Sequence, residues 1–447
     1  MRFLSLILYL LLTVSLSAQK LPLLKVSGDK HFLQTEKGEA FFWLGGTAWE
    51  MIHRLTREEC KLYLQDRAGK GFNVLQTVIL AELDGLTVPN AYGDLPLIDQ
   101  DPTQWNEAYF QQVDKVVKMA AKEGLYVALL PTWGDKFNLK WGVGPEIFTP
   151  ENAETYGAML ARRYLKHNHI IWVLGGDRLP ENEAHFAIIR AMAKGIRSVD
   201  QRHLITYHPQ GGKLATDFFA DDDWLDLDMF QSGHDRQLRD YTYVQKNRRL
   251  SQALPVINAE PRYENIPDRF WVEDQELVWM DDADIRSAAW WSMMSGAAGF
   301  TYGCNDIWQM YQMGRKPEIY ARTGWQAALE LPGSTQMGYM KTFFEAFPWQ
   351  KMQADSSLIL NENPHNETHM IATMDVDRAF ILVYTPFGND VKVDIKRLGT
   401  EKIEVNWFNP RSGQSLLIGT FDKEHTAPFT PPSHGRGSDY VLVLKGK

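Results

Sequence analysis

Ile170-Ile171-Trp172-Val173-Leu174-Gly175-Gly176-Asp177 is an apolar run that ends in a carboxylate, and Pro255-Val256-Ile257-Asn258-Ala259-Glu260 is a second one. A parallel strand buried on both faces is apolar throughout, and catalytic side chains emerge at the carboxyl ends of such strands in an α/β barrel. The 83 residues that separate the two acids leave room for about three strand-and-helix units of ~30 residues each. This spacing predicts that Asp177 and Glu260 follow strands four and seven of one barrel.

The same alternation of apolar strand and amphipathic helix extends on both sides of these stretches. Thr56 and Glu59 have the spacing of a capping box that opens one of the helices. Further helices are expected at 105–123, 149–164 and 183–199, and strands at 41–47, 73–81, 125–131, 170–174, 204–208, 227–231, 256–259 and 298–302. Eight strands alternating with helices predict a (β/α)8 TIM barrel over residues 19–350.

The pattern changes after residue 350. Short alternating strands, at 358–360, 370–374, 379–384, 391–395, 403–406 and 440–444, are separated by turn signals such as Asn409-Pro410-Arg411-Ser412-Gly413. They predict a C-terminal antiparallel β-sandwich domain over residues 351–447. Within the barrel, the stretch 83–102 is rich in Asp, Pro and Gly and predicts a long loop, which in a compact domain is often functional.

The N-terminus has the features of a secretory signal peptide. Arg2 is followed by an apolar stretch from Phe3 to Leu16 and by the small residues Ser17 and Ala18. We therefore expect residues 1–18 to be a signal peptide and the protein to be exported, either periplasmic or secreted. No cysteine lies near the expected cleavage point, so a lipid anchor is not expected.

Composition limits the classes of partner. Hydrophobic residues at 44% and charged residues at 23% are typical of a folded globular chain. The formal net charge of −9 disfavours nucleic acid and anionic membranes as partners. The only two cysteines, Cys60 and Cys304, are expected to be buried free thiols.

Each of the two acids has a structural alternative to a catalytic role. Asp177 could be the N-cap of the following helix, since Asp is common at that position. Glu260 could form a purely structural ion pair with Arg262, because a buried carboxylate needs a partner. Two glycines before Asp177 favour a sharp bend that brings its carboxyl into the barrel mouth.

Other polar and aromatic residues are expected on the same rim. The residues assigned to substrate binding are Trp49, Gln76, Trp133, Asp135, His208, His234, Arg262 and Tyr302. His208, His234 and Asp228 could also indicate a metal site, but the His-x-His strand motif of barrel metallohydrolases is absent. No metal and no cofactor are therefore expected.

Four motifs resemble a known family. Trp-Leu-Gly-Gly-Thr-Ala-Trp at 43–49, Trp-Val-Leu-Gly-Gly-Asp at 172–177, Ile-Asn-Ala-Glu-Pro at 257–261 and Trp-Phe-Asn-Pro-Arg-Ser-Gly at 407–413 resemble the family 140 glycoside hydrolases. The resemblance implies a barrel joined to a C-terminal sandwich often called a collagen-binding domain, and an apiosidase that acts on pectic rhamnogalacturonan II in gut Bacteroidetes. It also implies that Asp177 is the acid/base and Glu260 the nucleophile of a retaining mechanism.

One motif departs from the wider barrel clan, which has Asn-Glu at the end of strand four where this chain has Gly176-Asp177. Because Asp is one methylene shorter than Glu, the backbone has to approach the substrate more closely. The expected partner is an oligo- or polysaccharide, and a galacturonate carboxylate would need an Arg or Lys on the rim. Two alternatives stay open: a retaining β-glycanase of other specificity, and a non-catalytic exported protein that binds a glycan or matrix.

Overall fold

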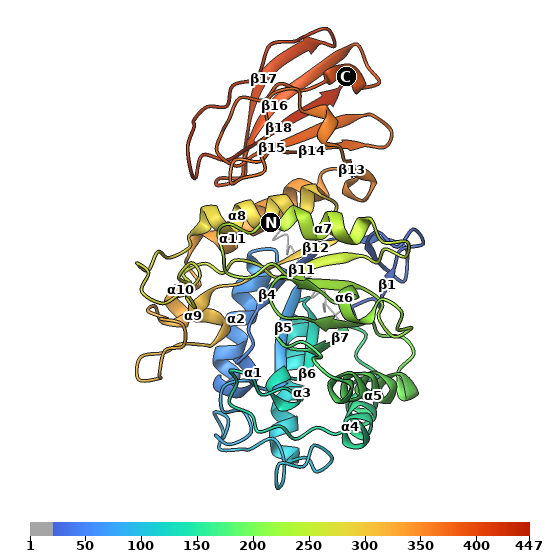
Figure 1. The fold of residues 1–447 in the computed structure, drawn as a ribbon, viewed down its shortest axis with the longest axis vertical. Coiled ribbons are helices and arrows are strands. Elements are labelled where there is room, and N and C mark those ends of the chain that lie inside the picture. The colour runs from blue at the N-terminus through green and yellow to red at the C-terminus, as the bar shows by residue number, and fades with distance from the viewer. Residues whose placement is uncertain (1–20) are drawn as a thin grey trace, which may run out of the picture.

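The computed structural model describes residues 21–447, in which a barrel carries a separate C-terminal sheet (Figure 1). The expected signal peptide, residues 1–18, lies outside the described residues. The described chain opens with a small antiparallel sheet formed by β1 (Leu24–Val26), β2 (Leu33–Thr35) and β3 (Ala40–Phe41). From there the chain enters the barrel directly.

Within residues 21–447 the central sheet has nine strands. Eight of them pair in parallel: β4 (Trp43–Thr47), β5 (Val74–Leu80), β6 (Tyr126–Thr132), β7 (Ile170–Gly175), β8 (Ile205–His208), β10 (Asp228–Gln231), β11 (Val256–Glu260) and β12 (Gly299–Tyr302). The ninth, β9 (Lys213–Leu214), pairs antiparallel with β10. The barrel closes between β8 and β10, where the Asp226 amide, just before β10, donates to the Ile205 carbonyl of β8 at 2.9 Å. The predicted (β/α)8 barrel is therefore confirmed.

Helices surround this barrel (Figure 1). The long ones are α2 (Arg57–Gly69), α3 (Glu107–Lys122), α4 (Pro150–Tyr164), α5 (Glu183–Val199), α7 (Asp240–Arg248), α8 (Asp282–Met294) and α11 (Pro332–Glu345), and the short ones are α1 (Met51–Arg54), α6 (Thr216–Phe219), α9 (Asn305–Trp308) and α10 (Trp325–Ala328). The predicted capping box is present at α2, where the Thr56 side chain accepts from the Glu59 amide and the Glu59 side chain accepts from the Thr56 amide. Such caps fix where helices begin, because they satisfy amides that have no partner within the helix.

Burial on both faces explains the unbroken apolar strands. In β7, Ile171 and Val173 pack inside the barrel, whereas Ile170, Trp172 and Leu174 pack outward against the helix layer. Neither face of the strand meets water, so no polar residue interrupts the run before its end. Cys60 and Cys304 are buried and free, as expected.

The C-terminal domain is built on a six-stranded antiparallel sheet in the described part of the chain, with strand order β13-β14-β15-β18-β16-β17. Its strands are β13 (Met352–Ala354), β14 (Ile371–Asp375), β15 (Phe380–Thr385), β16 (Lys402–Asn409), β17 (Gln414–Asp422) and β18 (Tyr440–Gly446). Leu382 and Val443 on one face belong to the main core. Ile381 and Leu442 on the other face pack under an irregular second layer, so this sandwich has one regular and one irregular side.

Two of the strand predictions in this domain were wrong. Residues 358–360 and 391–395 make only the isolated bridge between Ile359 and Val393 and form the irregular layer. The structure adds β17, an edge strand in which Leu416 and Leu417 are more than half exposed. Its exposure removes the alternation of buried and exposed residues from which strands are recognised.

The two domains share a buried interface in which α8 and α11 lie beneath the C-terminal sheet (Figure 1). Trp290 of α8 stacks on Tyr384 of β15 with ring centroids 5.7 Å apart. The Arg286 guanidinium donates to both carboxylate oxygens of Asp439, at 2.8 to 3.0 Å, and both side chains are almost fully buried. A buried, bidentate ion pair thus joins the barrel to the C-terminal sheet.

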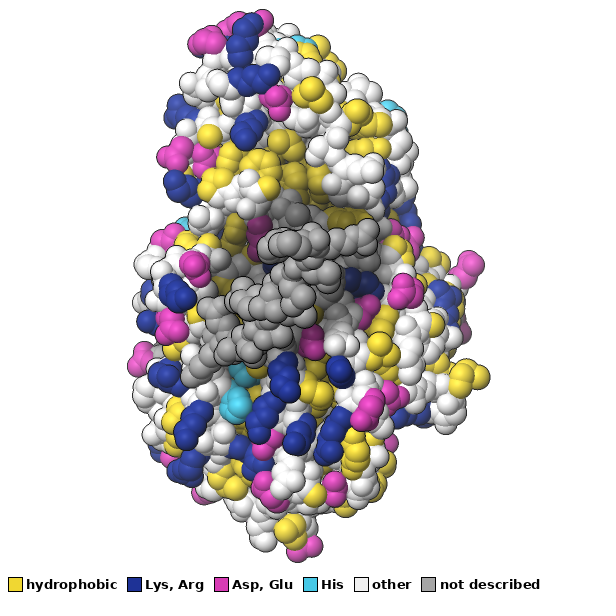
Figure 2. All heavy atoms as spheres, turned by 180° about the vertical axis from the view of Figure 1, so that it is seen from behind, with side chains coloured by type: hydrophobic (Ala, Val, Ile, Leu, Met, Phe, Trp, Pro, Cys, Tyr) yellow, Lys and Arg dark blue, Asp and Glu magenta, His cyan; other side chains and the backbone are white. Residues whose placement is uncertain are grey.

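The surface is of mixed charge. Seen from behind, Lys and Arg side chains alternate with acidic ones over the barrel, and hydrophobic side chains gather on the C-terminal domain near the junction (Figure 2). No helix within residues 21–447 is long and apolar enough to cross a membrane.

Replacing Asp439 by Asn should lower the free energy of unfolding by about 3 kcal/mol, because Arg286 would keep its buried charge without its main counter-charge. Urea denaturation followed by tryptophan fluorescence measures this change. Asp377→Asn is the matched control, since Asp377 pairs with Lys351 on the surface and its side chain is 65% exposed. Equal stability of the two variants would contradict an energetic role for the buried pair.

Candidate active site

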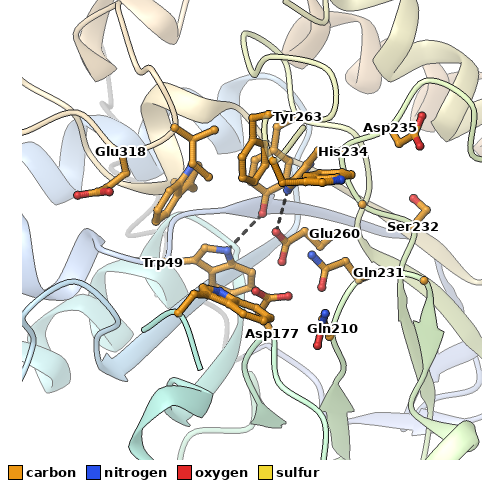
Figure 3. A pocket seen from close by; sticks show the side chains of 18 of the residues that line it. Trp49, Asp177, Gln210, Gln231, Ser232, His234, Asp235, Glu260, Tyr263 and Glu318 are labelled. Atoms are coloured by element: carbon orange, nitrogen blue, oxygen red, sulfur yellow. Dashed lines mark hydrogen bonds and ion pairs between the residues drawn. The ribbon is translucent and has the colours of Figure 1, made fainter. Parts of the chain in front are cut away.

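A cavity of about 760 Å³ opens at the carboxyl ends of the barrel strands. Asp177, Gln231, His234 and Glu260 lie around it, and the carboxylates of Asp177 and Glu260 point into the same space (Figure 3). Each comes from the end of a strand or from the loop that follows it. In a parallel barrel these ends converge, which makes this face the usual place for catalysis.

Asp177 is held by an unusual stretch of backbone. Gly175, the last residue of β7, and the next two residues, Gly176 and Asp177, have φ values of 88°, 105° and 52°, all in the left-handed region. A Cβ atom at Gly176 would lie 2.9 Å from the Gly134 amide nitrogen and 3.1 Å from the Cα of Trp133, so this position requires glycine. The N-cap of α5 is Asn182, and the alternative role of Asp177 as its cap is therefore wrong.

The environment of Asp177 favours its neutral form. Burial raises the pKa of the Asp177 carboxyl, and the nearby charge of Glu260 raises it further, to about 7. The Arg178 guanidinium, 3.6 Å away, lowers the pKa of Asp177, but its effect is smaller than the combined effect of burial and Glu260. At neutral pH this carboxyl therefore retains a large protonated fraction and is able to donate a proton.

The environment of Glu260 favours its ionised form. Burial alone would raise the pKa of Glu260, but two histidines oppose it and lower the pKa to about 2. His208 Nε2 lies 3.2 Å from one carboxylate oxygen and His234 Nε2 lies 3.3 Å from the other. Both carboxylate oxygens thus face an imidazole, and the negative charge is stabilised inside the pocket.

Tyr263 and Trp49 complete the wall beside Glu260. The indole of Trp49 donates to the Tyr263 hydroxyl at 3.2 Å, and the Tyr263 ring packs on His234 with centroids 4.5 Å apart (Figure 3). Burial and the Glu260 charge raise the pKa of Tyr263 well above its usual range, so the phenol stays protonated. Sequence reasoning missed Tyr263, although an aromatic residue three positions after a strand-end acid was a usable signal.

Three of the predicted binding residues lie at this site. Trp49 and His234 line the cavity, and His208 contacts Glu260 from beneath it. Trp133 does not reach the cavity surface. Its ring packs behind Trp49 with centroids 5.2 Å apart and is 2% exposed, so it supports the wall instead of forming it.

The predictions for Gln76 and Asp135 need correction. Gln76 points into the barrel interior, where it donates to the Ala259 carbonyl at 3.0 Å and accepts from the Thr301 hydroxyl at 3.2 Å. Asp135 is fully buried, pairs with Lys136 at 2.7 Å and accepts from the Gly144 amide at 2.8 Å. Both side chains satisfy buried polar groups and have no free face toward a ligand.

Arg262 and Tyr302 were also placed wrongly. Arg262 turns away from Glu260 and forms a buried ion pair with Asp240 at 3.0 Å, so the expected structural pair between Glu260 and Arg262 does not form. The Tyr302 hydroxyl donates to the buried Glu264 carboxylate at 2.6 Å and is not part of the cavity lining. Both side chains point toward the helix layer. The spacing of residues in the sequence does not predict the direction of a side chain at or beyond the end of a strand.

The cavity gains most of its outer wall from loops. Trp141 and Trp271 are 57% and 55% exposed and line it together with Phe270 and Trp308. The Trp141 ring lies 4.2 Å over the Arg178 guanidinium, which holds the ring in place. Flat exposed rings beside polar side chains suit the apolar faces of sugar rings. The sequence did not predict these residues, because a single Trp in a loop is part of no periodic pattern.

The cavity lining is acidic. Glu82, Asp235 and Glu318 join the two central carboxylates, and no Lys or Arg of residues 21–447 belongs to the lining. Burial raises the pKa of Glu82 well above its usual range. The Arg178 charge opposes this shift, and the charges of Asp135 and Asp177 add to it. A ligand in this space would therefore meet carboxyl groups and no Lys or Arg of the described residues.

Comparison with known proteins agrees with this geometry. A family model described as "Apiosidase-like, catalytic domain" matches residues 27–351, and one described as "Putative collagen-binding domain of a collagenase" matches residues 354–445. No curated protein sequence matches the chain significantly.

Two solved structures resemble the whole chain. One is described as a glycoside hydrolase family 5 from Bacteroides vulgatus and is 31% identical, with a TM-score of 0.87, covering 95% of this chain and 93% of that chain. The other is described as a glycoside hydrolase and is 30% identical, also with a TM-score of 0.87, covering 95% of this chain and 97% of that chain. Both relatives therefore share the barrel and the C-terminal domain.

Gly176→Ala should destabilise the protein more than Gly124→Ala. Both positions have positive φ, but an added Cβ meets nothing within 4 Å at Gly124 and meets backbone at Gly176. The left-handed conformation costs about 1–2 kcal/mol at each position, and forced displacement adds about 1–3 kcal/mol at Gly176. Urea denaturation of both variants measures the difference, and equal losses would contradict the close approach to residues 133 and 134.

Asp177→Asn should stabilise the protein in a pH-dependent way. Because the pKa of Asp177 is raised in the folded state to about 7, the stability linked to its proton is complete below pH ~4 and is lost as pH rises through 7. Asn stays neutral, so the variant should match wild type near pH 4 and exceed it by up to ~4 kcal/mol at pH 8. A constant difference across this range, in denaturation at several pH values, would contradict the raised pKa.

Proposed function

The chain belongs to the apiosidase-like catalytic domain family, and from that premise we propose that it is a retaining glycoside hydrolase that releases apiose from galacturonate in the side chains of rhamnogalacturonan II. One observation carries the proposal. Asp177 and Glu260 share one cavity, and their surroundings favour opposite protonation states. Such a division between two carboxyls is what a glycosidase of the retaining type requires.

In the proposed first step, the Glu260 carboxylate attacks the anomeric carbon while Asp177 donates its proton to the glycosidic oxygen. The bond to the leaving sugar breaks, and a covalent bond between the sugar and Glu260 replaces it. In the second step, ionised Asp177 takes a proton from water, whose oxygen attacks the same carbon and releases Glu260. Two inversions return the sugar with its original configuration.

The neighbouring residues have defined tasks in this sequence. His208 and His234 keep Glu260 ionised before attack and stabilise it again as the departing carboxylate. The protonated Tyr263 hydroxyl lies beside the nucleophile, where it is able to donate to the charged oxygen. Trp49, Trp141 and Trp271 are the proposed stacking surfaces for the sugar rings.

The family 140 assignment and the pectic substrate rest on the motifs quoted above, and the apiosidase-like family model supports them. A non-catalytic binding protein has no need to hold two carboxyls in opposite states, so this alternative is less favoured. The proposed cellular location is the periplasm or the exterior, on the evidence of the N-terminal signal pattern.

The wild-type protein should release apiose from rhamnogalacturonan II. Variants of Asp177 and Glu260 should release far less or none. Asp177→Asn should lower kcat by about 10²–10⁴-fold for substrates with a poor leaving group, and Glu260→Gln should abolish turnover. Proton NMR of the first product should show the configuration of the substrate linkage. Glu318→Gln, which removes a cavity carboxylate away from the reacting pair, is the matched control.

The opposite anomer as first product would contradict the nucleophilic role of Glu260. Release of a different sugar with retention would favour the β-glycanase alternative, whereas no release from any plant glycan would favour the binding protein.

A further inference from the structure

A second cavity, of about 700 Å³, lies where the barrel meets the C-terminal domain. Its lining comes from residues 31–32, from the end of α7, from residues 293–297 at and after the end of α8, and from parts of 349–356 and 363–373. Residues 293–297 lead into the amino end of β12, whereas the catalytic cavity lies at the carboxyl ends of the strands. The junction cavity is therefore at the opposite end of the barrel and is not part of the catalytic pocket.

Arg248 places a positive charge in the wall of the junction cavity. Its Nη2 donates to the carbonyls of Gly296 and His31, but its Nη1 is buried and makes no hydrogen bond to any residue of the described range. Among residues 21–447 no carboxylate lies within 4.0 Å of this guanidinium. Burial lowers its pKa to about 10, although the more distant charge of Asp29 acts in the opposite direction. A half-buried guanidinium that no carboxylate contacts is stabilised by an anion that binds to it.

Two buried hydroxyls line the same cavity. Ser295 and Thr373 are 5% and 1% exposed, and neither hydroxyl has a hydrogen-bond partner among the described residues. Buried polar side chains without a partner are uncommon in proteins. The side-chain amides of Gln245, Gln350 and Gln353 add further donors and acceptors to the lining.

The charge of this cavity is the reverse of that in the catalytic pocket. Arg248 and Arg249 face it, and the carboxylate of Asp355 is engaged by Arg397 at 3.1 Å. A ligand with one carboxylate and several hydroxyls matches a guanidinium surrounded by hydroxyl and amide groups.

We propose that the junction cavity is a non-catalytic site for a uronic acid residue of an anionic glycan, with the sugar carboxylate on Arg248 and its hydroxyls toward Ser295 and Thr373. The proposal rests on the proposed function in that the substrate is a pectic polymer rich in uronate. Since the two cavities open at opposite ends of the barrel, a short oligosaccharide occupies one of them at a time. A polymer held at the junction raises the local concentration of its own side chains at the catalytic pocket.

Calorimetric titration of the whole protein with trigalacturonic acid tests the site, with galactotriose as the neutral counterpart of the same sugar configuration. Every sample carries Glu260→Gln, so nothing is hydrolysed and the result does not depend on whether the protein is a glycosidase. Onto this background are placed Arg248→Gln, the isosteric Thr373→Val, and Arg162→Gln as a control. Arg162 is an exposed arginine of α4 and lines no part of the cavity.

Trigalacturonic acid should bind and galactotriose should not. Arg248→Gln should weaken binding about tenfold or more, as expected for loss of a charge-assisted hydrogen bond. Thr373→Val should weaken it about threefold without disturbing the fold, and Arg162→Gln should leave it unchanged. Hydrogen exchange should show protection of residues 293–297 and 363–373 when the ligand is bound.

The proposal is overturned if trigalacturonic acid does not bind, if galactotriose binds equally well, or if Arg248→Gln and Thr373→Val both bind like the control. Displacement of the ligand by sodium phosphate at equal concentration would also overturn it, because it would identify a general anion site. Sugar release from rhamnogalacturonan II by a protein that fails this test would leave the proposed catalytic function intact.

Discussion

The site depends on one electrostatic constraint, which is that two carboxyls in one buried cavity have to carry different charges. Mutual repulsion alone would keep one proton on the pair without deciding which acid holds it. The asymmetry comes from the surroundings. Two imidazoles face Glu260, whereas Asp177 has burial and a more distant guanidinium at 3.6 Å. The barrel supplies this arrangement, since the ends of β7, β8, β10 and β11 converge on one rim.

The sequence was sufficient to predict the barrel and the positions of Asp177 and Glu260 at its strand ends. It was not sufficient to predict which side chains surround these two acids. The strands were predicted because burial on both faces leaves an uninterrupted apolar pattern, as in β7. The directions of side chains beyond the strand ends have no such pattern. Arg262 lies only two residues after Glu260, yet it pairs with Asp240 because the chain has already left the strand. Gln76 fills the barrel interior, where a polar residue is the exception.

The C-terminal domain also has a structural role in the catalytic half. One face of its sheet packs on α8 and α11, with Trp290 against Tyr384 and Phe343 against Phe408 at 4.4 Å. Helix α8 connects to β12, the neighbour of the strand that carries Glu260. A large apolar contact behind this part of the barrel restricts movement of β11 and β12. The irregular outer layer of the sandwich packs in a separate core cluster and takes no part in that contact.

The acidic lining of the catalytic cavity bears on how the enzyme would approach a pectic substrate. Five carboxyl groups line the cavity, and no Lys or Arg of the described residues accompanies them, so a uronate placed inside would meet no Lys or Arg counter-charge there. For the proposed substrate we therefore expect the neutral terminal sugar inside this space and the uronate to which it is attached at the open rim beside the exposed tryptophans. Such an orientation favours removal of side-chain sugars over cleavage within a galacturonate backbone. In the proposed reaction Asp177, which like the two glycines before it has a left-handed backbone, then donates its proton to the oxygen that links this terminal sugar to the uronate.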